Sequence, residues 1–173
     1  MKVIFLDVDG VLNSDEYIDR AKKLDLQGIE RDIDVEKIKL LEKAINETGA
    51  KVVLSSSWRY TKNVKYLKEL LARYGIFVDS TPFIQNERGL EIRQWLSENR
   101  GVEDFIILDD EVFESYDEEL MKKLVKISNG NGYGLGEGLR QDDIDEIIRR
   151  LGRKKSRDNI EKEEQERWSI FEK

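Results

Sequence analysis

Two carboxylates near the start of the chain have the spacing and the setting of reactive groups. Asp7 and Asp9 follow the short apolar run at residues 3–6 and precede Gly10, which lets a chain turn sharply. A run of β-branched and aromatic residues bounded by polar ones is typical of a strand buried on both faces. Ligands of open α/β sheets bind at the carboxyl ends of the strands. The pair could therefore serve as nucleophile, metal ligand and proton donor.

A calcium loop and a plain turn are the alternatives for this segment. An EF-hand loop carries acids at positions one, three and five and Gly at position six. Here Gly10 stands at position four of the run and a strand precedes it, which disfavours calcium. A strand-ending turn rich in Asp and Gly is common and needs no chemistry, so other parts of the chain must decide.

Polar side chains also follow two later apolar runs, at the point where each predicted strand ends. Ser55 and Ser56 follow one run, and Asp109 and Asp110 follow the other. Because the carboxyl ends of parallel strands meet at one edge of a sheet, we expect both pairs to lie beside Asp7. This convergence favours a functional site over a plain turn.

The expected group of aspartates limits the chemistry that this edge can perform. Carboxylates gathered together repel one another unless a cation or a proton intervenes, and oxygen-only ligands with a substrate phosphate suit Mg²⁺. Such a site suits phosphoryl transfer. Asp7 could attack phosphorus and form an aspartyl phosphate, while Asp9 protonates the leaving oxygen and then activates water. A hydroxyl from Ser55 and a cation from Arg88 would hold the other phosphoryl oxygens.

The composition excludes several other kinds of site. The chain has no Cys and no His, which rules out disulfides, thiolate or His-ligated metals, cysteine nucleophiles and His general bases. Its 173 residues fit one domain of ordinary size. No apolar run approaches the ~20 residues that span a bilayer, and the first residues lack a signal-peptide layout. We therefore expect a cytoplasmic protein without a membrane partner.

Charge is unevenly spread along the chain. The formal net charge of −7 argues against strong non-specific binding to nucleic acid. Residues 51–100 nevertheless carry nine Lys/Arg and five Asp/Glu, a balance of +4 that leaves −11 for the remainder. We expect an anionic substrate to be drawn to this middle segment.

Helix signals alternate with the predicted strands. Asp34 and Thr61 have the pattern of N-caps, and Gly49, Gly75 and Gly101 that of helix ends. Alternation of this kind predicts an α/β fold with a parallel sheet, right-handed crossovers and helices on both faces. The expected strands are residues 3–6, 51–54, 76–79, 105–108 and 124–127, with further helices within 115–123 and 144–151.

Three segments lack a clear helical or strand pattern. Residues 14–33 are mostly polar, and we expect a loop or a short irregular flap near the site. Residues 130–138 alternate glycines, which predicts a flexible loop, and Leu135 stands where a dinucleotide fingerprint needs its third glycine. Residues 153–173 hold seven basic and six acidic residues, as expected of a solvated helix or frayed extension. We therefore divide the chain into a domain at 1–152 and a charged tail at 153–173.

Three motifs resemble those of the haloacid dehalogenase (HAD) superfamily of phosphohydrolases. Residues 7–13, Asp-Val-Asp-Gly-Val-Leu-Asn, are similar to its first motif. Ser55, at the end of Val-Val-Leu-Ser, is similar to its second motif, and the Asp109-Asp110 pair to its fourth. The resemblance covers roughly residues 1–150 in the expected order.

The third motif of this superfamily is a Lys or Arg before the helix that leads into the fourth. Arg88 is the best match in this chain. Lys65 and Arg93 stay open as alternatives.

The resemblance has consequences for the fold and for the site. It implies a Rossmann-like three-layer sandwich with a mainly parallel central sheet. It implies that Asp7 is the nucleophile and Asp9 the acid/base. It also implies that Mg²⁺ is held by Asp7, the backbone carbonyl of Asp9 and the Asp109/Asp110 pair, and we expect Gly10 to line the substrate site.

A narrower resemblance points to one subgroup. The segments Leu-Ser-Ser-Ser-Trp-Arg, Arg-Gly-Leu-Glu-Ile and Ile-Leu-Asp-Asp-Glu, with a later Gly-Leu pair, are similar to HAD domains linked to Swiss-army-knife RNA repair proteins. Asn13 departs from the superfamily pattern, because many members have Thr there. The gap between the first two motifs is too short for a large cap domain. Capless members tend to act on large or accessible substrates, often polynucleotides or proteins.

Aromatic and basic side chains follow the second motif directly. Ser56 is followed closely by Trp58, Arg59, Tyr60 and Lys62. Stacking together with phosphate contact is a common way to bind single strands, so we expect Ser56, Trp58 and Arg59 to bind substrate. Alternatively, Trp58 packs against the sheet edge and the lysines belong to a solvated helix face.

Together these features predict a Mg²⁺-dependent phosphohydrolase that works through an aspartyl phosphate on a nucleotide or polynucleotide phosphate end. One alternative is a small-metabolite phosphatase. Another is a non-catalytic phosphate- or nucleic-acid-binding module that has kept the fold. The intact Asp7/Asp9 pair speaks against the binding module, since a pure binder needs no acid at position 9.

Overall fold

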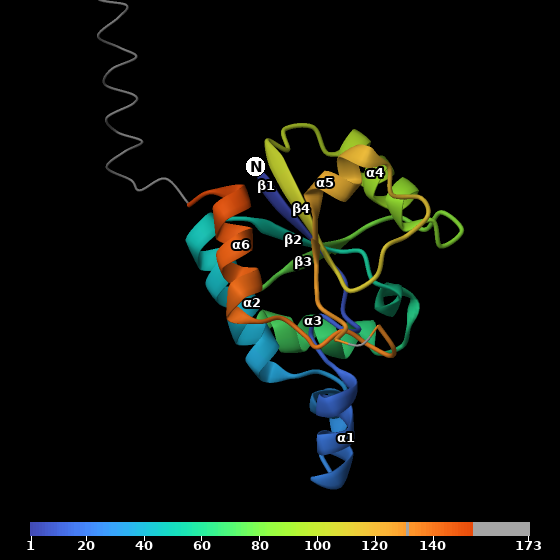
Figure 1. Ribbon diagram of the computed structural model, residues 1–173, viewed down its shortest axis with the longest axis vertical. Helices are drawn as coiled ribbons and strands as arrows, with labels where there is room; N and C mark the ends of the chain where they lie inside the picture. The colour runs from blue at the N-terminus through green and yellow to red at the C-terminus, as the bar shows by residue number, and fades with distance from the viewer. Residues whose placement is uncertain (131, 154–173) are drawn as a thin grey trace, which may run out of the picture.

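The chain folds as a Rossmann-like three-layer α/β sandwich, in which a parallel sheet lies between two layers of helices (Figure 1). The computed structural model describes residues 1–130 and 132–153. Apart from Arg153, the predicted charged tail lies outside the described residues. The α/β fold class predicted from the alternation of strands and helices is confirmed.

Five strands, all parallel, form the sheet in the order β3-β2-β1-β4-β5. Leu6 of the central strand β1 is in register with Leu54 of β2 and with Leu108 of β4. The three central strands therefore end at nearly the same level, and the residues that follow them meet at one edge. The strand bounds are Lys2–Leu6 (β1), Lys51–Leu54 (β2), Val78–Ser80 (β3), Asp104–Asp109 (β4) and Leu124–Lys126 (β5).

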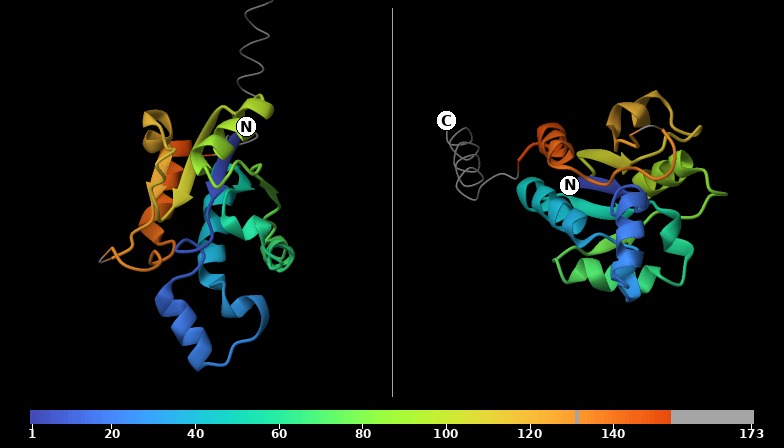
Figure 2. Two further views of the ribbon diagram at one scale, coloured as in Figure 1. Left: turned by 90° about the vertical axis from the view of Figure 1, so that its right-hand side faces the viewer. Right: turned by 60° about the horizontal axis from the view of Figure 1, so that its bottom comes forward.

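Alternate side chains of β1 pack into two different cores. Ile4 and Leu6 lie in the core under helices α2, α3 and α6, and Val3 and Phe5 lie in the core under α4 and α5. Figure 2 shows these two helix layers on opposite sides of the sheet. A strand buried on both faces is what the apolar run at residues 3–6 predicted. The helix bounds are Val35–Thr48 (α2), Val64–Ala72 (α3), Arg88–Glu98 (α4), Glu118–Lys123 (α5) and Gln141–Leu151 (α6).

The segment at residues 14–33, predicted as a loop or irregular flap, contains a helix. α1 (Asp15–Lys23) begins after Ser14, whose hydroxyl caps it, and the 3-10 helix η1 (Gly28–Arg31) follows. The prediction was wrong because only two of the nine residues of α1 are buried, too few to produce a helical period. α1 extends beyond the sheet, away from the body of the molecule (Figures 1 and 2).

The predicted ends of the other helices are right at some positions and shifted at others. Asp34 caps α2 as predicted, with its carboxylate accepting from the N–H of the second helical residue. Thr61 does not cap α3, because it ends the preceding 3-10 helix η2 (Ser57–Tyr60). α3 and α4 each end a few residues before the predicted Gly75 and Gly101.

No large cap domain covers the sheet within the described part of the chain, because α1 and η1 are the only helical segments between β1 and α2. The connection from β2 to β3 is η2 followed by α3. None of the helices in the described residues combines the length and the apolar character needed to cross a membrane.

Candidate active site

The loops that follow β1, β2 and β4 meet at one edge of the sheet. The N–H of Asp7 donates to the carbonyl of Leu108 (2.9 Å), and the N–H of Ser55 donates to the carbonyl of Leu6 (2.9 Å). The hydrogen-bond ladder thus continues one residue past β1 and β2. Sheet register therefore brings Asp7, Ser55 and Asp109 together, although they lie far apart in the sequence.

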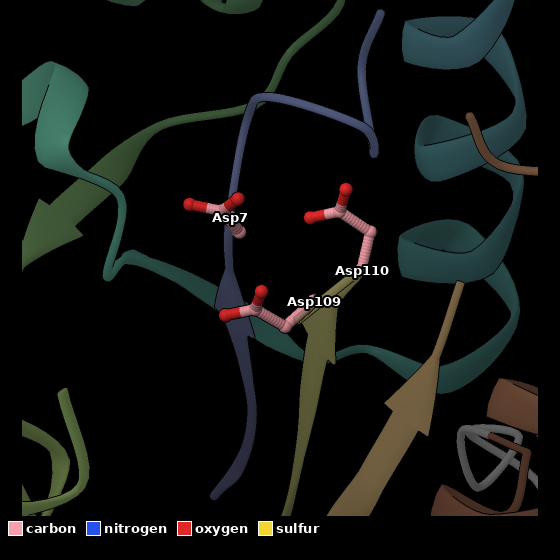
Figure 3. A group of neighbouring side chains, drawn as sticks. All are labelled: Asp7, Asp109 and Asp110. Carbon is pink, nitrogen blue, oxygen red and sulfur yellow. The ribbon is translucent and has the colours of Figure 1, made fainter. Parts of the chain in front are cut away.

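Asp7, Asp109 and Asp110 form a group of buried carboxylates (Figure 3). One oxygen of each lies within 4.8 Å of the oxygens of the other two. Asp7 and Asp109 come from neighbouring strand ends, and Asp110 follows at the end of β4. Three oxygen donors at this spacing are a set that a hard divalent cation prefers.

Arg88, in the first turn of α4, binds two of these carboxylates. Its Nη1 donates to Asp7 Oδ1 at 2.8 Å and to Asp109 Oδ2 at 2.7 Å. The ring of Phe113 covers the guanidinium at 4.4 Å, and the Tyr116 hydroxyl donates to Asp109 Oδ2 at 3.3 Å. These contacts fix the guanidinium against the two acids.

The other two basic residues considered for this position lie elsewhere. Lys65 is exposed and is paired with Glu69 at 3.9 Å. Arg93 is paired with Asp117 at 2.6 Å. Of the three candidates, the structure brings Arg88 alone into contact with the carboxylate group.

Burial dominates the acid–base properties of this group. It raises the pKa of Asp7, although the Arg88 guanidinium opposes the change. Burial and then the Asp7 carboxylate raise the pKa of Asp109 to about 7. Burial also raises the pKa of Asp110, against the effect of a hydrogen bond from the Gly136 N–H. Three carboxylates with one guanidinium leave an excess of negative charge, which a proton or a cation can neutralise.

Asp9 has different surroundings. Its Oδ1 accepts from Asn13 Nδ2 and its Oδ2 accepts from Trp58 Nε1, both at 2.9 Å. Asn13 is itself held, because its Oδ1 accepts from the Gly10 N–H (2.8 Å) and its Nδ2 donates to the Asp32 carbonyl (2.9 Å). Two neutral donors therefore orient the Asp9 carboxylate at the rim of the site, where it is half-buried.

Three glycines let the loop after β5 approach the Asp110 carboxylate and the loop after β1 closely. Gly10 has φ +73°, and a Cβ there would lie 2.1 Å from Asp110 Oδ2. The N–H of Gly136 donates to that same oxygen at 2.6 Å, and the N–H of Gly138 donates to the Gly10 carbonyl at 3.1 Å. The glycine-rich loop after β5 is thus bound to the first loop, and only glycine fits at position 10.

The two serines after β2 differ in their contacts. Ser55 is completely buried, and its Oγ has no hydrogen-bond partner within the described part of the chain. A buried hydroxyl without a partner is costly, so this group is available to a ligand oxygen. The Ser56 side chain is hydrogen-bonded to Asp7 and accepts from the Trp58 N–H at 3.3 Å.

Trp58 and Arg59 are both engaged by the protein. Trp58 is half-buried, packs against the larger core and binds Asp9, so it does more than the packing alternative implied. The Arg59 guanidinium pairs with the buried carboxylate of Glu91 and donates to the Ser56 carbonyl at 2.6 Å. Substrate binding by these two residues stays a prediction.

Three further residues belong to the site but were not singled out from the sequence. Asn13 departs from the superfamily pattern, although its place in the first loop is a usable signal. Glu91 follows Arg88 by one helical turn and shares the buried side of α4 with Ile92 and Trp95, and its place beside these apolar positions could have marked it as a buried partner. Tyr116 has no such signal, because only the fold brings its hydroxyl to Asp109.

Comparison with known proteins adds one finding to this geometry. Residues 3–135 match a family model described as "HAD domain in Swiss Army Knife RNA repair proteins". The matched range contains all four carboxylates, both serines and Arg88. Neither a curated protein nor a solved structure matches the chain.

Proposed function

The chain belongs to the family of HAD domains in Swiss Army Knife RNA repair proteins, and we propose that it is a phosphohydrolase that cleaves phosphate monoesters through an aspartyl phosphate on Asp7. The observation that carries this proposal is the setting of Asp7. A buried guanidinium binds it, two further carboxylates lie within 4.8 Å, and Ser55, whose Oγ has no hydrogen-bond partner among the described residues, follows the neighbouring strand at the same sheet edge. Nucleophile, anion-binding groups and cation ligands are thereby present in one place.

In the first half-reaction, an Asp7 carboxylate oxygen attacks the phosphorus of the substrate. A new bond forms between that oxygen and phosphorus, and the bond from phosphorus to the ester oxygen breaks. Arg88, already bound to Asp7, and the Ser55 hydroxyl would stabilise charge on the phosphoryl oxygens. Arg88 also keeps Asp7 in one orientation, which reduces the entropy lost on the way to the transition state.

Asp9 would supply the proton transfers of both half-reactions. As an acid it gives its proton to the leaving ester oxygen, and as a base it takes a proton from the water that attacks the phosphorylated Asp7. The products are the alcohol, inorganic phosphate and free Asp7. The hydrogen bonds from Asn13 and Trp58 hold the Asp9 carboxylate in place for these steps.

The residues around Asp7 also fit a Mg²⁺ ion. The donors are all oxygens, three carboxylates converge within 4.8 Å, and burial raises the pKa of each of them. Asp109 is already bound to Arg88, Tyr116 and a backbone N–H, so we assign the direct contact on this strand to Asp110. When bound, Mg²⁺ would neutralise charge on the reacting phosphate.

A phosphate at the end of a nucleotide or polynucleotide is the substrate that we favour. The family description names RNA repair proteins, the segment at 51–100 carries a balance of +4, and no large cap domain appears among the described residues. A small-metabolite phosphatase is the second candidate, because the carboxylate group itself does not select the alcohol.

A substrate panel tests this function. Wild-type protein with Mg²⁺ is given phosphorylated nucleotides, sugar phosphates and RNA oligonucleotides phosphorylated at either end, and inorganic phosphate is measured. We expect Mg²⁺-dependent release that is fastest from a nucleic-acid end. Release from sugar phosphates alone would favour the small-metabolite candidate, and no release from any ester would leave the non-catalytic binding module as the better description.

A further inference from the structure

Two exposed aromatic rings lie together beside the site. Tyr60 ends η2, which follows the Ser55 loop, and Phe83 lies in the loop after β3. Their ring centroids are 5.0 Å apart at an interplanar angle of 82°. The two residues are 48% and 58% exposed. Large aromatic side chains left in contact with water next to a polar site are a common mark of ligand binding.

Contacts through Glu91 and Arg59 connect this aromatic pair to helix α4. Glu91 is buried, pairs with Arg59, and accepts from the Tyr60 hydroxyl at 3.5 Å and from the Ile84 N–H at 3.0 Å. Arg59 also lies over the Tyr60 ring at 4.3 Å. Glu91 follows Arg88 by one turn of α4, about 5 Å along the axis. The aromatic pair is therefore linked, through Glu91, to the same helix that carries Arg88.

Three exposed lysines follow Tyr60 closely in the chain. Lys62, Lys65 and Lys68 are all exposed, and they follow Tyr60 into the first turns of α3. They account for much of the positive balance of residues 51–100 in a chain whose net charge is −7. Exposed aromatic rings with adjacent cations are the pattern by which proteins bind single-stranded nucleic acid.

We propose that Tyr60 and Phe83 form a stacking subsite for the base that adjoins the reacting phosphate of a single-stranded nucleic-acid end. This inference rests on the proposed function, because that function places the phosphate at Asp7. Stacking on the rings accepts any base, since every base has a π-face. The base must not already be stacked on neighbouring bases, so binding of a single strand is favoured over binding of a duplex end. Lys62 and its neighbours would contact the phosphates further along.

Binding to a form that cannot turn over tests the subsite without using activity. Asp7→Asn protein is titrated with a fluorescent, terminally phosphorylated oligonucleotide, and Kd is measured by anisotropy. We expect Tyr60→Ala and Phe83→Ala, each added to this background, to raise Kd roughly 5- to 150-fold. Phe83→Trp should keep tight binding, and a blunt duplex with the same terminal phosphate should bind less tightly than the single strand.

Phe77→Ala is the matched control. Phe77 is 78% exposed and precedes β3, whereas Phe83 follows it, so the two rings lie at opposite ends of the same strand. If loss of exposed apolar surface alone weakened binding, Phe83→Ala and Phe77→Ala would both raise Kd. The proposed subsite predicts instead that Phe77→Ala leaves Kd unchanged. Thermal melting of each variant checks that it is folded.

Turnover separates the subsite from the proposed function. In the wild-type background, Tyr60→Ala and Phe83→Ala should lower the ratio of kcat/KM for the oligonucleotide to that for a small alkyl phosphate, by the same 5- to 150-fold. Equal Kd for the variants and the parent, or equal Kd for single strand and duplex, would overturn the subsite and leave the phosphohydrolase intact. Wild-type protein that hydrolyses no phosphate ester would overturn the proposed function, and the anisotropy measurement would still decide whether the rings bind a base.

Discussion

Asp7 and Asp9 are two residues apart, yet the fold gives them opposite surroundings. Asp7 is buried among Asp109, Asp110 and the charged Arg88. Asp9 is half-buried and is bound by the neutral side chains of Asn13 and Trp58. One carboxylate thus lies in a dense group of charges, and the other is oriented by uncharged donors.

Under the proposed function, this difference divides two roles between chemically identical groups of one short loop. The group around Asp7 has more negative than positive charge, which suits a cation, and a bound cation would in turn offset the charge of a phosphoryl group. Asp9 stays apart from that excess and reaches the rim, where a leaving group or a water can meet it. Each of the following experiments changes a residue either in the group around Asp7 or at Asp9 and its neighbours.

The largest effect is expected at the nucleophile. Asp7→Asn removes the attacking oxygen while keeping the shape of the side chain, so phosphatase activity should fall at least roughly 10³-fold. The variant should remain folded, because the change removes one of several like charges that are buried together. Beryllium fluoride, which mimics a phosphorylated aspartate, should bind the wild type only. Substantial turnover by Asp7→Asn would exclude the covalent mechanism.

The second-largest effect is expected at Asp110, the residue that we assign to Mg²⁺ binding. Asp110→Asn is expected to raise the Mg²⁺ concentration needed for half-maximal rate by roughly 10–100-fold, with much of the rate restored at high Mg²⁺. Asp9→Asn is the matched control, because its carboxylate faces Asn13 and Trp58 rather than the buried acids. It should lose rate on poor leaving groups and keep the wild-type Mg²⁺ titration. Identical Mg²⁺ titrations for Asp110→Asn and the wild type would remove Asp110 from the metal site.

A pH effect on stability should follow from the burial of Asp109 beside the Asp7 carboxylate. Asp109 has a pKa of about 7 in the folded protein, against 3.8 ordinarily, so between these values the folded protein binds more protons than the unfolded chain. The free energy of unfolding should therefore fall as pH rises from about 4 to about 7 in EDTA, relative to Asp109→Asn. Chemical denaturation at several pH values measures this difference.

Added Mg²⁺ should reduce that fall, because the cation takes the place of the proton. A difference between the wild type and Asp109→Asn that is constant across this pH range would show that Asp109 is ionised throughout.

The smallest effect is expected on the Asp9 side. Trp58→Phe removes the indole N–H that binds Asp9 and keeps an aromatic ring in the core, so kcat should fall about tenfold or less. The loss should be greater for esters with poor leaving groups, where the proton from Asp9 matters most. Rates on a series of esters with different leaving groups measure this dependence.

Trp95→Phe provides a matched control for that variant. Trp95 also donates its indole N–H to a carboxylate, Asp79, at 3.1 Å, but it lies in the core under α4 and α5. It should affect stability without changing the dependence on the leaving group. Equal leaving-group dependence for Trp58→Phe and the wild type would mean that the bond to Asp9 has no part in positioning the acid.

Much of the fold could be predicted from local patterns. The runs at residues 3–6, 51–54 and 105–108 are strands, and Asp34 caps α2, because burial on both faces and capping leave signals in a few adjacent residues. The resemblance to HAD domains of RNA repair proteins is confirmed by the family match. α1 was missed for the converse reason, since a helix with few buried residues leaves little pattern.

By itself, the sequence determined which groups were available and near which strand ends they would lie. It has no His and no Cys, and its acids and serines follow three apolar runs, so a group of oxygen-bearing side chains at one sheet edge could be predicted from composition and spacing. Local sequence can carry this information because a strand and the residue after it are neighbours in the chain.

Only the tertiary structure decided how those groups are paired. It placed Arg88, and neither Lys65 nor Arg93, between Asp7 and Asp109. It paired Arg59 with Glu91, and it placed Trp58 where its indole N–H donates to Asp9. These partners lie tens of residues apart, and which of several equivalent cations or donors reaches a given carboxylate depends on sheet register and helix packing. Sheet register and helix packing cannot be read from the residues next to Asp7, Asp9 or Arg59 in the chain, because the type of a side chain does not specify its distant partner.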